Sequence, residues 1–376
     1  MTPIRLAYLQ SHLSYGSVEA YLQTLIEGVD RERFDPWLVC PDHPSLERLR
    51  QVPELEGRVV TVPSGAPLPS FLWTRRRALR SIRPALVHCA DFDPPGMLAA
   101  RGANRSAHVV VTYNTPELRP EFNAVGRLTA RAAWAVRPWV IFTSAADCET
   151  GVDRDPIAPA RAEVIPYGID MDRFAPRDGA EMRAALGIAP GRRVVGTVGY
   201  LREQKQHTYL LQAAERLDRR RGDIEWLIVG DGELRAQLEE EVRTRELTGK
   251  VHFLGNRNDV AELLAAFDVF ALSSDFEGMC FAVAEALAVE VPVVSTDVGG
   301  VGQSVVHEET GLLVPTRDVD ALASSIERLL DDRDEAARLA RAGRLRVEQL
   351  YALPRMVEAT ERLYLRALGR EPRIRS

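Results

Sequence analysis

The feature that most constrains this chain is an alternation of short, almost entirely apolar runs with longer helical patterns, from one end to the other. The apolar runs are rich in β-branched residues and include IRLAYL, PWLVC, ALVHC, HVVVTY and WVIFTS. Strands that are apolar at nearly every position are buried on both faces, and such strands occur in parallel sheets covered by helices. The sequence therefore predicts an α/β fold built from βαβ units.

The alternation pauses once, in GIDMDRFAPRDGAEMRAALGIAPGRR, and resumes with RVVGTVGY, IEWLIVGDG, VHFLG and VFALSS. A chain of 376 residues also exceeds what one hydrophobic core usually serves. We therefore predict two doubly wound, Rossmann-like parallel-sheet domains, residues 1–175 and 176–352, and a C-terminal helix in 353–376 that packs back on the N-terminal domain. Open parallel sheets bind ligands beyond the carboxyl ends of their strands, so we expect the active site in a cleft between the two domains.

Composition excludes several classes of protein. The net charge of −6 argues against general nucleic-acid binding, which usually requires a basic surplus. The four cysteines are far apart and form no C-x-x-C pair, so neither a zinc site nor a disulfide framework is indicated. The sequence shows no signal-peptide pattern and no apolar run of about 18 residues. We expect a cytoplasmic protein.

Two carboxylates stand out in FEGMCFAVAEALAVEVPVV, a run that otherwise resembles packed interior. Glu277 lies in the loop after the strand VFALSS, and Glu285 projects from an apolar stripe of the following helix. A buried carboxylate needs a partner, which can be a vicinal diol that donates two hydroxyl protons or an arginine from another element. The backbone of Gly278, Met279, Cys280 and Phe281 forms the open N-terminus of that helix, which favours an anion such as phosphate.

A second candidate group follows the strand RVVGTVGY. Gly199 allows close approach of a ligand to the backbone, and Arg202 and Lys205 follow in the turn before the next helix. Only two of the 48 basic residues are lysines, Lys205 and Lys250, so a lysine at this position favours a phosphate contact over a solvated surface charge.

The N-terminal half offers weaker signals. Gly16 and Ser17 open the first helix after the strand IRLAYL, where glycine permits close approach and serine can cap the helix. Asn114 ends the strand HVVVTY and offers both a donor and an acceptor, although asparagine is also common in turns.

Taken together, these motifs resemble those of the retaining glycosyltransferases of family 4, which have the two-domain GT-B fold. The motifs are Glu277-x7-Glu285, Gly199-x5-Lys205, VIPYGIDMDRFAP and HEETGLLVPTRDVDALASSIERLL, and the resemblance covers essentially the whole chain. It implies that the C-terminal domain binds a nucleotide-sugar donor, UDP- or GDP-linked, and that the reaction needs no metal and no cofactor.

The same resemblance implies a role for each matching residue. Glu285 would hold the ribose hydroxyls and Glu277 would contact the transferred sugar. Amides of residues 278–281 would meet the sugar and phosphates, and Lys205, with Arg202 nearby, would hold the diphosphate. Asn256 and Arg257 are also assigned to the donor site, although they do not distinguish uracil from guanine.

The chain departs from the family pattern at several positions. The usual Gly-Arg-Leu is Gly199-Tyr200-Leu201, so Arg202 would have to supply the second phosphate charge. The usual double glycine near the N-terminus is Gly16-Ser17, and Gln303 replaces a glutamate. Asn114 stands where the family has a histidine near the donor sugar, and Tyr167 replaces an asparagine.

The acceptor is a hydroxyl compound that the sequence does not identify. FLWTRRRALRSIRP can form a helix with Arg75, Arg76, Arg80 and Arg83 on one side and apolar residues on another. EFNAVGRLTARAAWAVRPW, with Arg127, Arg131, Trp134 and Arg137, has a similar pattern. Such helices can lie on the inner face of an anionic membrane, or they can pack their apolar faces on the domain's own sheet while the arginines face water.

We therefore predict a metal-independent, retaining hexosyltransferase that uses a nucleotide-sugar. Two alternatives are a nucleotide-sugar 2-epimerase of the same architecture and a non-catalytic protein that binds a nucleotide-sugar. The family-type pair of glutamates favours transfer over epimerisation, and Asn114 in place of histidine favours the non-catalytic alternative.

Overall fold

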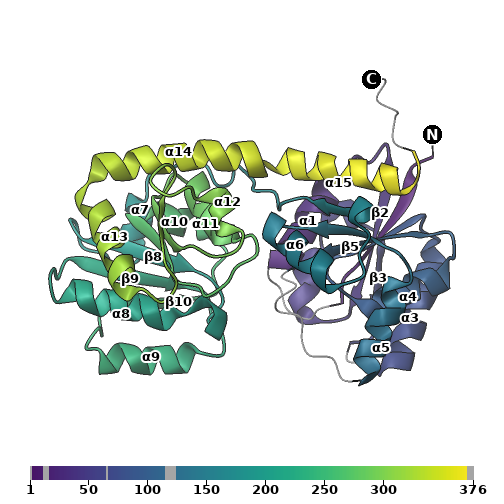
Figure 1. Ribbon diagram of the computed structural model, residues 1–376, viewed down its shortest axis with the longest axis horizontal. Coiled ribbons are helices and arrows are strands. Elements are labelled where there is room, and N and C mark those ends of the chain that lie inside the picture. Colours follow the sequence, from purple (N-terminus) through teal and green to yellow (C-terminus); the bar gives the residue numbers. More distant parts are fainter. Residues whose placement is uncertain (1, 12–16, 65–66, 115–123, 371–376) are drawn as a thin grey trace. The chain divides into compact units, whose positions relative to one another are not determined.

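The computed structural model describes residues 2–11, 17–64, 67–114 and 124–370 and consists of two α/β units (Figure 1). The first unit contains residues 1–168 and 353–376, and the second contains residues 169–352. The chain thus leaves the first unit after Gly168 and returns to it at Leu353, whereas sequence analysis set the first boundary at residue 175.

In the described part of the chain, the first unit has a seven-stranded parallel sheet in the order β3-β2-β1-β4-β5-β6-β7. Its strands are β1 (Ile4–Leu9), β2 (Phe34–Pro41), β3 (Val59–Val62), β4 (Leu86–Cys89), β5 (His108–Tyr113), β6 (Trp139–Phe142) and β7 (Ala162–Val164). Its helices are α1 (Ser17–Gly28), α2 (Glu47–Arg50), α3 (Leu68–Ile82), α4 (Pro94–Ala103), α5 (Ala124–Trp134), α6 (Ala145–Arg154) and α15 (Leu353–Ala367).

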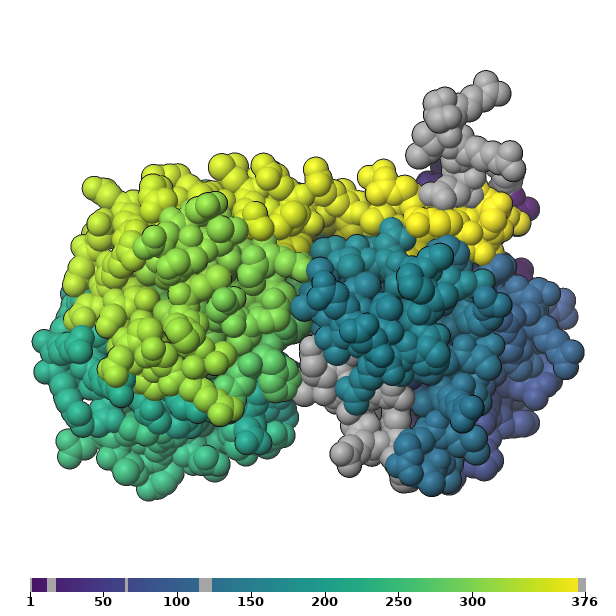
Figure 2. All heavy atoms as spheres, in the orientation of Figure 1, coloured from purple at the N-terminus to yellow at the C-terminus, as the bar shows by residue number. Residues whose placement is uncertain are grey.

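Two layers of helices cover this sheet. Helices α3, α4 and α5 lie side by side (Figure 1) and pack residues such as Leu79, Met97 and Ala133 onto one core with the strands. The last helix, α15, packs on the first unit through the fully buried Tyr364, whose hydroxyl lies 2.6 Å from Nδ1 of His88 on β4. Figure 2 shows the yellow atoms of α15 against teal atoms of this unit. Arg366 of α15 forms an ion pair with Glu163.

The second unit has, among the described residues, a six-stranded parallel sheet in the order β10-β9-β8-β11-β12-β13. Its strands are β8 (Arg193–Val198), β9 (Ile224–Val229), β10 (Val251–Gly255), β11 (Val269–Leu272), β12 (Val293–Thr296) and β13 (Leu312–Val314). Its helices are α7 (Ala180–Ala185), α8 (His207–Asp218), α9 (Arg235–Thr244), α10 (Val260–Ala265), α11 (Phe281–Ala288), α12 (Val301–Ser304), α13 (Val319–Asp331) and α14 (Arg333–Tyr351).

Helices α8, α9 and α13 build one core of the second unit, with Leu211, Leu238 and Ile326 packed among strand residues. On α11, the three residues on either side of Glu285 are buried alanine, valine and leucine. This burial explains why the sequence of the helix is almost entirely apolar. The prediction of two parallel-sheet α/β units is confirmed.

Across the described ranges, no helix combines the length and the apolar character that crossing a bilayer requires. In the same residues, no three His, Cys, Asp or Glu side chains gather in a way that could hold a metal ion.

Candidate functional site

The strand order of the second unit creates a crevice site between β8 and β11. From β8 the chain proceeds outward through β9 and β10, and it then crosses to the other side of β8 to form β11. The loops that follow β8 and β11 therefore leave the sheet at the point where the direction of winding reverses, which is where open α/β sheets bind ligands. These are the loops that carry Lys205 and Glu277.

Hydrogen bonds hold the two loops together. The amide of Asp275 donates to the carbonyl oxygen of Gln204 at 2.9 Å, and the side-chain amide of Gln204 donates to the carbonyl oxygen of Phe276 at 2.7 Å. The hydroxyl of Ser273 donates to the carbonyl oxygen of Lys205 at 3.0 Å. These contributions of Gln204 and Ser273 were not predicted from the sequence. The available signal was the polar Ser273 directly after the apolar strand β11.

The centre of the site is a buried ion pair. Nζ of Lys205 lies 2.6 Å from Oε1 of Glu277, and the Lys205 and Glu277 side chains are only 13% and 7% exposed. The buried hydroxyl of Ser274 donates to the same carboxylate oxygen at 2.5 Å. Burial opposes the charge of Lys205, but the charge and the hydrogen bond of Glu277 outweigh it, and the pKa of the ammonium is raised. Lys205 is therefore a fixed cation.

Cys280 and His207 border this ion pair without being ionised at neutral pH. Burial, reinforced by Glu277, raises the pKa of the Cys280 thiol to about 12. Burial also lowers the pKa of His207 to about 4, and the charge of Lys205 adds to this effect. Because a nucleophilic cysteine must be a thiolate, Cys280 is an inert packing residue here. It is the N-terminal boundary residue of α11, and among the described residues no side chain caps that helix end.

Glu285 projects from α11 as a half-buried carboxylate, and no described side chain donates a hydrogen bond to it. Burial raises the pKa of Glu285 to about 7, and the charge of Arg173 opposes this rise only in part. The sequence left open whether an arginine would pair with Glu285. In the structure Arg173 acts on it through charge alone, and the Arg173 guanidinium donates to the backbone oxygen of Asn258 at 3.2 Å.

Glycines allow the backbone of this site to pack closely. A Cβ atom at Gly299 would collide with the carbonyl oxygen of Glu277, and Gly299 also has a positive φ of 46°. At Gly230 a Cβ atom would collide with the carbonyl oxygen of Gly199. Gly230 and Gly299 therefore support the loops of the site by letting two backbone segments approach closely.

The remaining donor-site predictions divide into two groups. Arg202 precedes the turn Glu203–Lys205, its charge acts on Lys205, and its buried Nε has no acceptor among the described residues. Asn256 and Arg257 are exposed, and Arg257 forms an ion pair with Asp259, its neighbour in the same loop. No contact of the described structure joins Asn256 or Arg257 to the Lys205 centre.

In the first unit, Gly16 lies outside the described residues and Ser17 is the first residue of α1. Asn114 follows β5, and the hydroxyl of Tyr167 donates to its Oδ1 at 2.5 Å. The two departures from the family pattern, Asn114 and Tyr167, are thus hydrogen-bonded to each other. Nδ2 of Asn114 is buried and has no acceptor among the described residues.

Two predictions about the basic helices are wrong. Arg75 was grouped with the solvated arginines of α3, but it is only 1% exposed, because it shares a helix face with Leu79 and Ile82 at four and seven residues' spacing. Trp134 was grouped with the basic residues of α5, but it is buried and its Nε1 donates to Asp155 at 3.1 Å.

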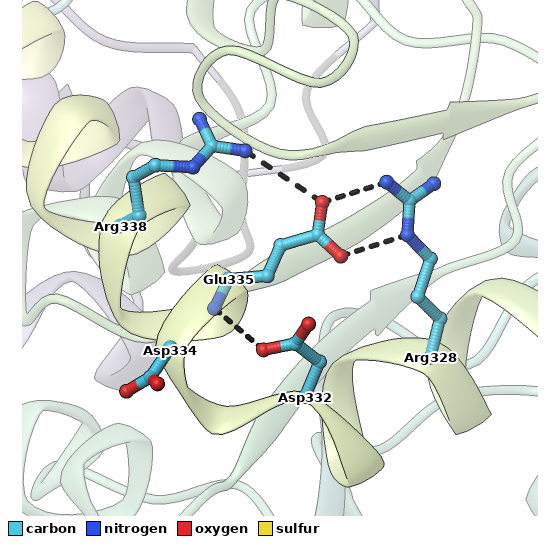
Figure 3. Close-up of a pocket in the computed structure, with 5 residues that line it drawn as sticks. All are labelled: Arg328, Asp332, Asp334, Glu335 and Arg338. Atoms are coloured by element: carbon cyan, nitrogen blue, oxygen red, sulfur yellow. Dashed lines mark hydrogen bonds and ion pairs between the residues drawn. The ribbon is translucent and has the colours of Figure 1, made fainter.

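A surface depression of the second unit, drawn in Figure 3, is a different kind of feature. Glu335 points between Arg328 and Arg338 and forms ion pairs with both, while Asp332 accepts a hydrogen bond from the amide of Glu335. These contacts join the end of α13 to the start of α14. Because its carboxylates and arginines pair with each other, we interpret this network as a structural contact that holds α13 against α14.

Comparison with known proteins identifies the family. The model of glycosyl transferases group 1 matches residues 178–346, and the model of glycosyltransferase family 4 matches residues 18–173. The EpsF protein of Bacillus subtilis, described as a glycosyltransferase, is 31% identical over 309 residues, which is 78% of this chain and 79% of the relative. The chain belongs to the family 4 glycosyltransferases.

Another relative of this glycosyltransferase is a GDP-mannose-dependent alpha-mannosyltransferase of Mycobacterium tuberculosis, 30% identical over 84% of this chain and 85% of the relative. Among solved structures, Anabaena HepE in complex with UDP-glucose has a TM-score of 0.82 at 20% identity, over 95% of this chain and 98% of that one. Sucrose-phosphate synthase of Thermosynechococcus elongatus has a TM-score of 0.83 at 22% identity, over 97% and 99%. These likenesses show the GT-B fold.

Proposed function

We propose that this glycosyltransferase transfers a hexose-type sugar from a UDP- or GDP-sugar to a hydroxyl acceptor with retention of the anomeric configuration. The observation that carries the proposal is the buried Lys205–Glu277 ion pair at the reversal point between β8 and β11. Glu285 lies on α11, the helix that follows the loop of Glu277. A fixed cation, an open helix end and an unpartnered carboxylate match the diphosphate and the ribose of a nucleotide-sugar.

Each part of the donor would have its own contact. The ribose diol would donate to Glu285, whose carboxylate accepts no hydrogen bond from any described side chain. The diphosphate would lie against the N-terminus of α11 and replace Glu277, whose Oε1 lies 2.6 Å from Nζ of Lys205, as the partner of that ammonium. The nearby Arg202, whose Nε lacks an acceptor among the described residues, would supply the second charge.

The chemistry follows from these contacts. The bond between the anomeric carbon and the diphosphate oxygen breaks, and the acceptor oxygen bonds to the same face of that carbon. The acceptor's proton passes to the departing diphosphate. Negative charge grows on the diphosphate in the transition state, where a preorganised ammonium and helix amides stabilise it more than in the ground state. We propose that Lys205 and Arg202 make a metal ion unnecessary, in which case a chelator would leave turnover unchanged.

The relatives support the choice of donor class. One relative is named for GDP-mannose, another for UDP-galactose, and the structural neighbour HepE was solved with UDP-glucose. A thermal-shift screen of nucleoside diphosphates and nucleotide-sugars tests the proposal, because a ligand that binds the folded state raises the melting temperature. Stabilisation by UDP or GDP compounds is the expected result, and an absence of stabilisation by any of them would contradict it.

A second experiment separates transfer from the alternatives. Purified protein is incubated with the stabilising nucleotide-sugar, with and without a panel of hydroxyl acceptors, and the products are followed by NMR. Transfer predicts an α-linked or β-linked product of the same anomeric configuration as the donor, formed only with an acceptor. A rearranged sugar formed without acceptor would identify an epimerase. Tight donor binding without any product would identify a binding protein.

We also propose peripheral association with an anionic membrane through α3, α4 and α5. These three helices contain no Asp or Glu, although the chain carries a net charge of −6. Their outer surface exposes Trp73, Val125 and Leu128 by 60%, 60% and 70%, beside exposed arginines such as Arg76 and Arg127. Exposed apolar side chains on helices whose charged residues are all arginines match an anionic bilayer.

Sedimentation with phosphatidylcholine vesicles, with and without phosphatidylglycerol, tests this association. The protein should bind only the anionic vesicles, and the double variant Trp73→Glu, Leu128→Glu should lose binding. Leu345→Glu is the matched control, because Leu345 is a comparably exposed leucine, at 61%, in the second unit. Equal loss of binding in the control, or no binding by the unaltered protein, would contradict the proposal.

A further inference from the structure

The first unit contains a buried arginine that no acceptor of the described structure satisfies. Arg75, in the middle of α3, is 1% exposed, and neither its Nε nor its Nη1 has a hydrogen-bond partner among the described residues. Its guanidinium stacks on the ring of Phe71, with Cζ 3.2 Å from the ring centroid. Stacking on an aromatic ring fixes the plane of the guanidinium but satisfies none of its N–H groups.

Such an arrangement is costly for the folded protein. A charged side chain is rarely fully buried without a partner, because it loses its hydration and gains no hydrogen bonds in return. Burial lowers the pKa of Arg75 to about 10, although Asp93 and Cys40 act against that change. A pKa of this size still leaves the guanidinium charged at neutral pH. A methionine or leucine would fill the same space without this cost.

Nearby groups do not neutralise this charge by direct contact. The charge of Asp93 acts on Arg75, but the two carboxylate oxygens of Asp93 accept hydrogen bonds from the hydroxyl of Ser11, at 2.5 Å, and from the amide of Gly96, at 2.9 Å. Cys40 is a buried thiol whose pKa burial raises to about 11, so it stays neutral. The acid beyond Cys40, Asp42, forms an ion pair with Arg50 at 2.6 Å.

The acid that acts on Arg75 lies near the point where the winding of the first sheet reverses. In the first sheet, β1 is flanked by β2 and β4, so the reversal of winding falls between β1 and β4. Ser11 follows β1 and Asp93 follows β4, and the hydrogen bond between them spans that reversal point at the carboxyl edge. Asp93, whose charge acts on Arg75, belongs to this edge, which is the ligand-binding edge of an open parallel sheet.

We infer that Arg75 binds an anionic oxygen group, a phosphate or a carboxylate, carried by the acceptor at the carboxyl edge of the first sheet. A guanidinium is suited to this task because it presents several N–H donors in one plane and remains charged when buried. The inference rests on the proposed function only for the identity of the ligand as the acceptor. The anion site itself is a property of the first unit and is tested without catalysis.

The test compares Arg75→Met with Arg76→Met, its exposed neighbour on the same helix. Melting temperature is measured with increasing inorganic phosphate or acetate, in the presence of a saturating nucleoside diphosphate that fills the site of the second unit. Phosphate or acetate should stabilise the unaltered protein and the Arg76 variant. The Arg75 variant should bind the anion about tenfold more weakly or worse, the loss expected for hydrogen bonds to a charged group.

Without added anion, Arg75→Met should melt at a higher temperature than the unaltered protein, because it removes an unpaired buried charge. Preference for phosphate over acetate identifies a phosphorylated acceptor, and the reverse identifies a carboxylate. If Arg75→Met melts lower and responds to anions as before, or if neither anion stabilises the unaltered protein, the inference is wrong. Stabilisation of both variants by the nucleoside diphosphate reports separately on the proposed function.

Discussion

The two units differ in how a buried cation is paired. In the second unit, Lys205 lies 2.6 Å from Glu277, and a serine hydroxyl and two joined loops complete the contact. In the first unit, Arg75 is at least as buried, but two of its nitrogens have no acceptor in the part of the unit that the structure describes. A paired cation is stable without a bound ligand, and it exchanges its carboxylate partner for the ligand when one binds. An unpaired cation lowers the stability of the ligand-free protein and gains a partner only from the ligand.

Replacing Lys205 should have the largest effect on this comparison. Lys205→Met leaves Glu277 buried without its cation, which should cost about 3–5 kcal/mol in the free energy of unfolding. This sign is opposite to that expected for Arg75→Met. Turnover should fall about 10²–10³-fold, because the growing charge on the diphosphate loses its ammonium.

Denaturant unfolding and steady-state kinetics measure both effects. The double variant Lys205→Met, Glu277→Gln should recover much of the stability but none of the activity. Lys250→Met is the control, because Lys250 is the other lysine of the chain and pairs with Asp218 away from these loops. Normal turnover in Lys205→Met would remove this residue from the mechanism.

Gly299→Ala tests whether the loops of the second unit are held as rigidly as their hydrogen bonds indicate. A Cβ atom would collide with the carbonyl oxygen of Glu277, at a residue whose φ is 46°. We expect a loss of at least about 2 kcal/mol in stability together with lower activity. Gly302→Ala is the control, because its Cβ atom would meet only Asp297, at 3.9 Å. Equal melting temperatures for the two variants would show that the loop backbone can shift to accommodate the Cβ atom at little cost in stability.

Glu285→Gln tests the pH dependence of the second unit. Because burial raises the pKa of Glu285 to about 7, above its value in the unfolded chain, the folded state binds the proton more tightly. The unaltered protein should therefore lose stability as pH rises from about 4.5 to 7, and the variant should be more stable by on the order of 1–3 kcal/mol above that range. The variant should also bind nucleoside diphosphate about tenfold more weakly.

Melting curves at several pH values and calorimetry of nucleotide binding check these two outcomes. The stability difference between variant and unaltered protein should vanish near pH 4, where both side chains are neutral. Unchanged nucleotide affinity would refute the contact with ribose, whatever the melting curves show.

Tyr364→Phe tests a buried polar contact of the first unit that, unlike Arg75, is satisfied. The variant leaves Nδ1 of His88 without the hydroxyl that lies 2.6 Å from it, and this should cost about 1–3 kcal/mol in stability. Arg362→Ala on the same helix removes only an exposed pair with Glu358 and should change stability little. Similar melting temperatures for both variants would mean that the buried hydrogen bond contributes nothing.

Much of this could be predicted from the sequence, for physical reasons. Apolar strands and their order along the chain predict a parallel α/β fold, and the spacing of Glu277, Glu285 and Lys205 carries the family resemblance. The sequence could not show that Lys205 pairs with Glu277, because they are far apart in the chain and meet only when β8 and β11 become neighbours. Arg75 was misplaced because a run of three arginines hides which one faces the core.

The return of α15 to the first unit has a consequence for synthesis. Leu363 and Tyr364 are fully buried in that unit, so its core remains open until α15 has been made. The second unit, whose residues 169–352 are continuous, has its whole sequence available earlier. Domains usually fold in the order in which they leave the ribosome. In this protein the order should be reversed, and a nascent chain that ends near residue 352 should expose an unfinished first unit to chaperones.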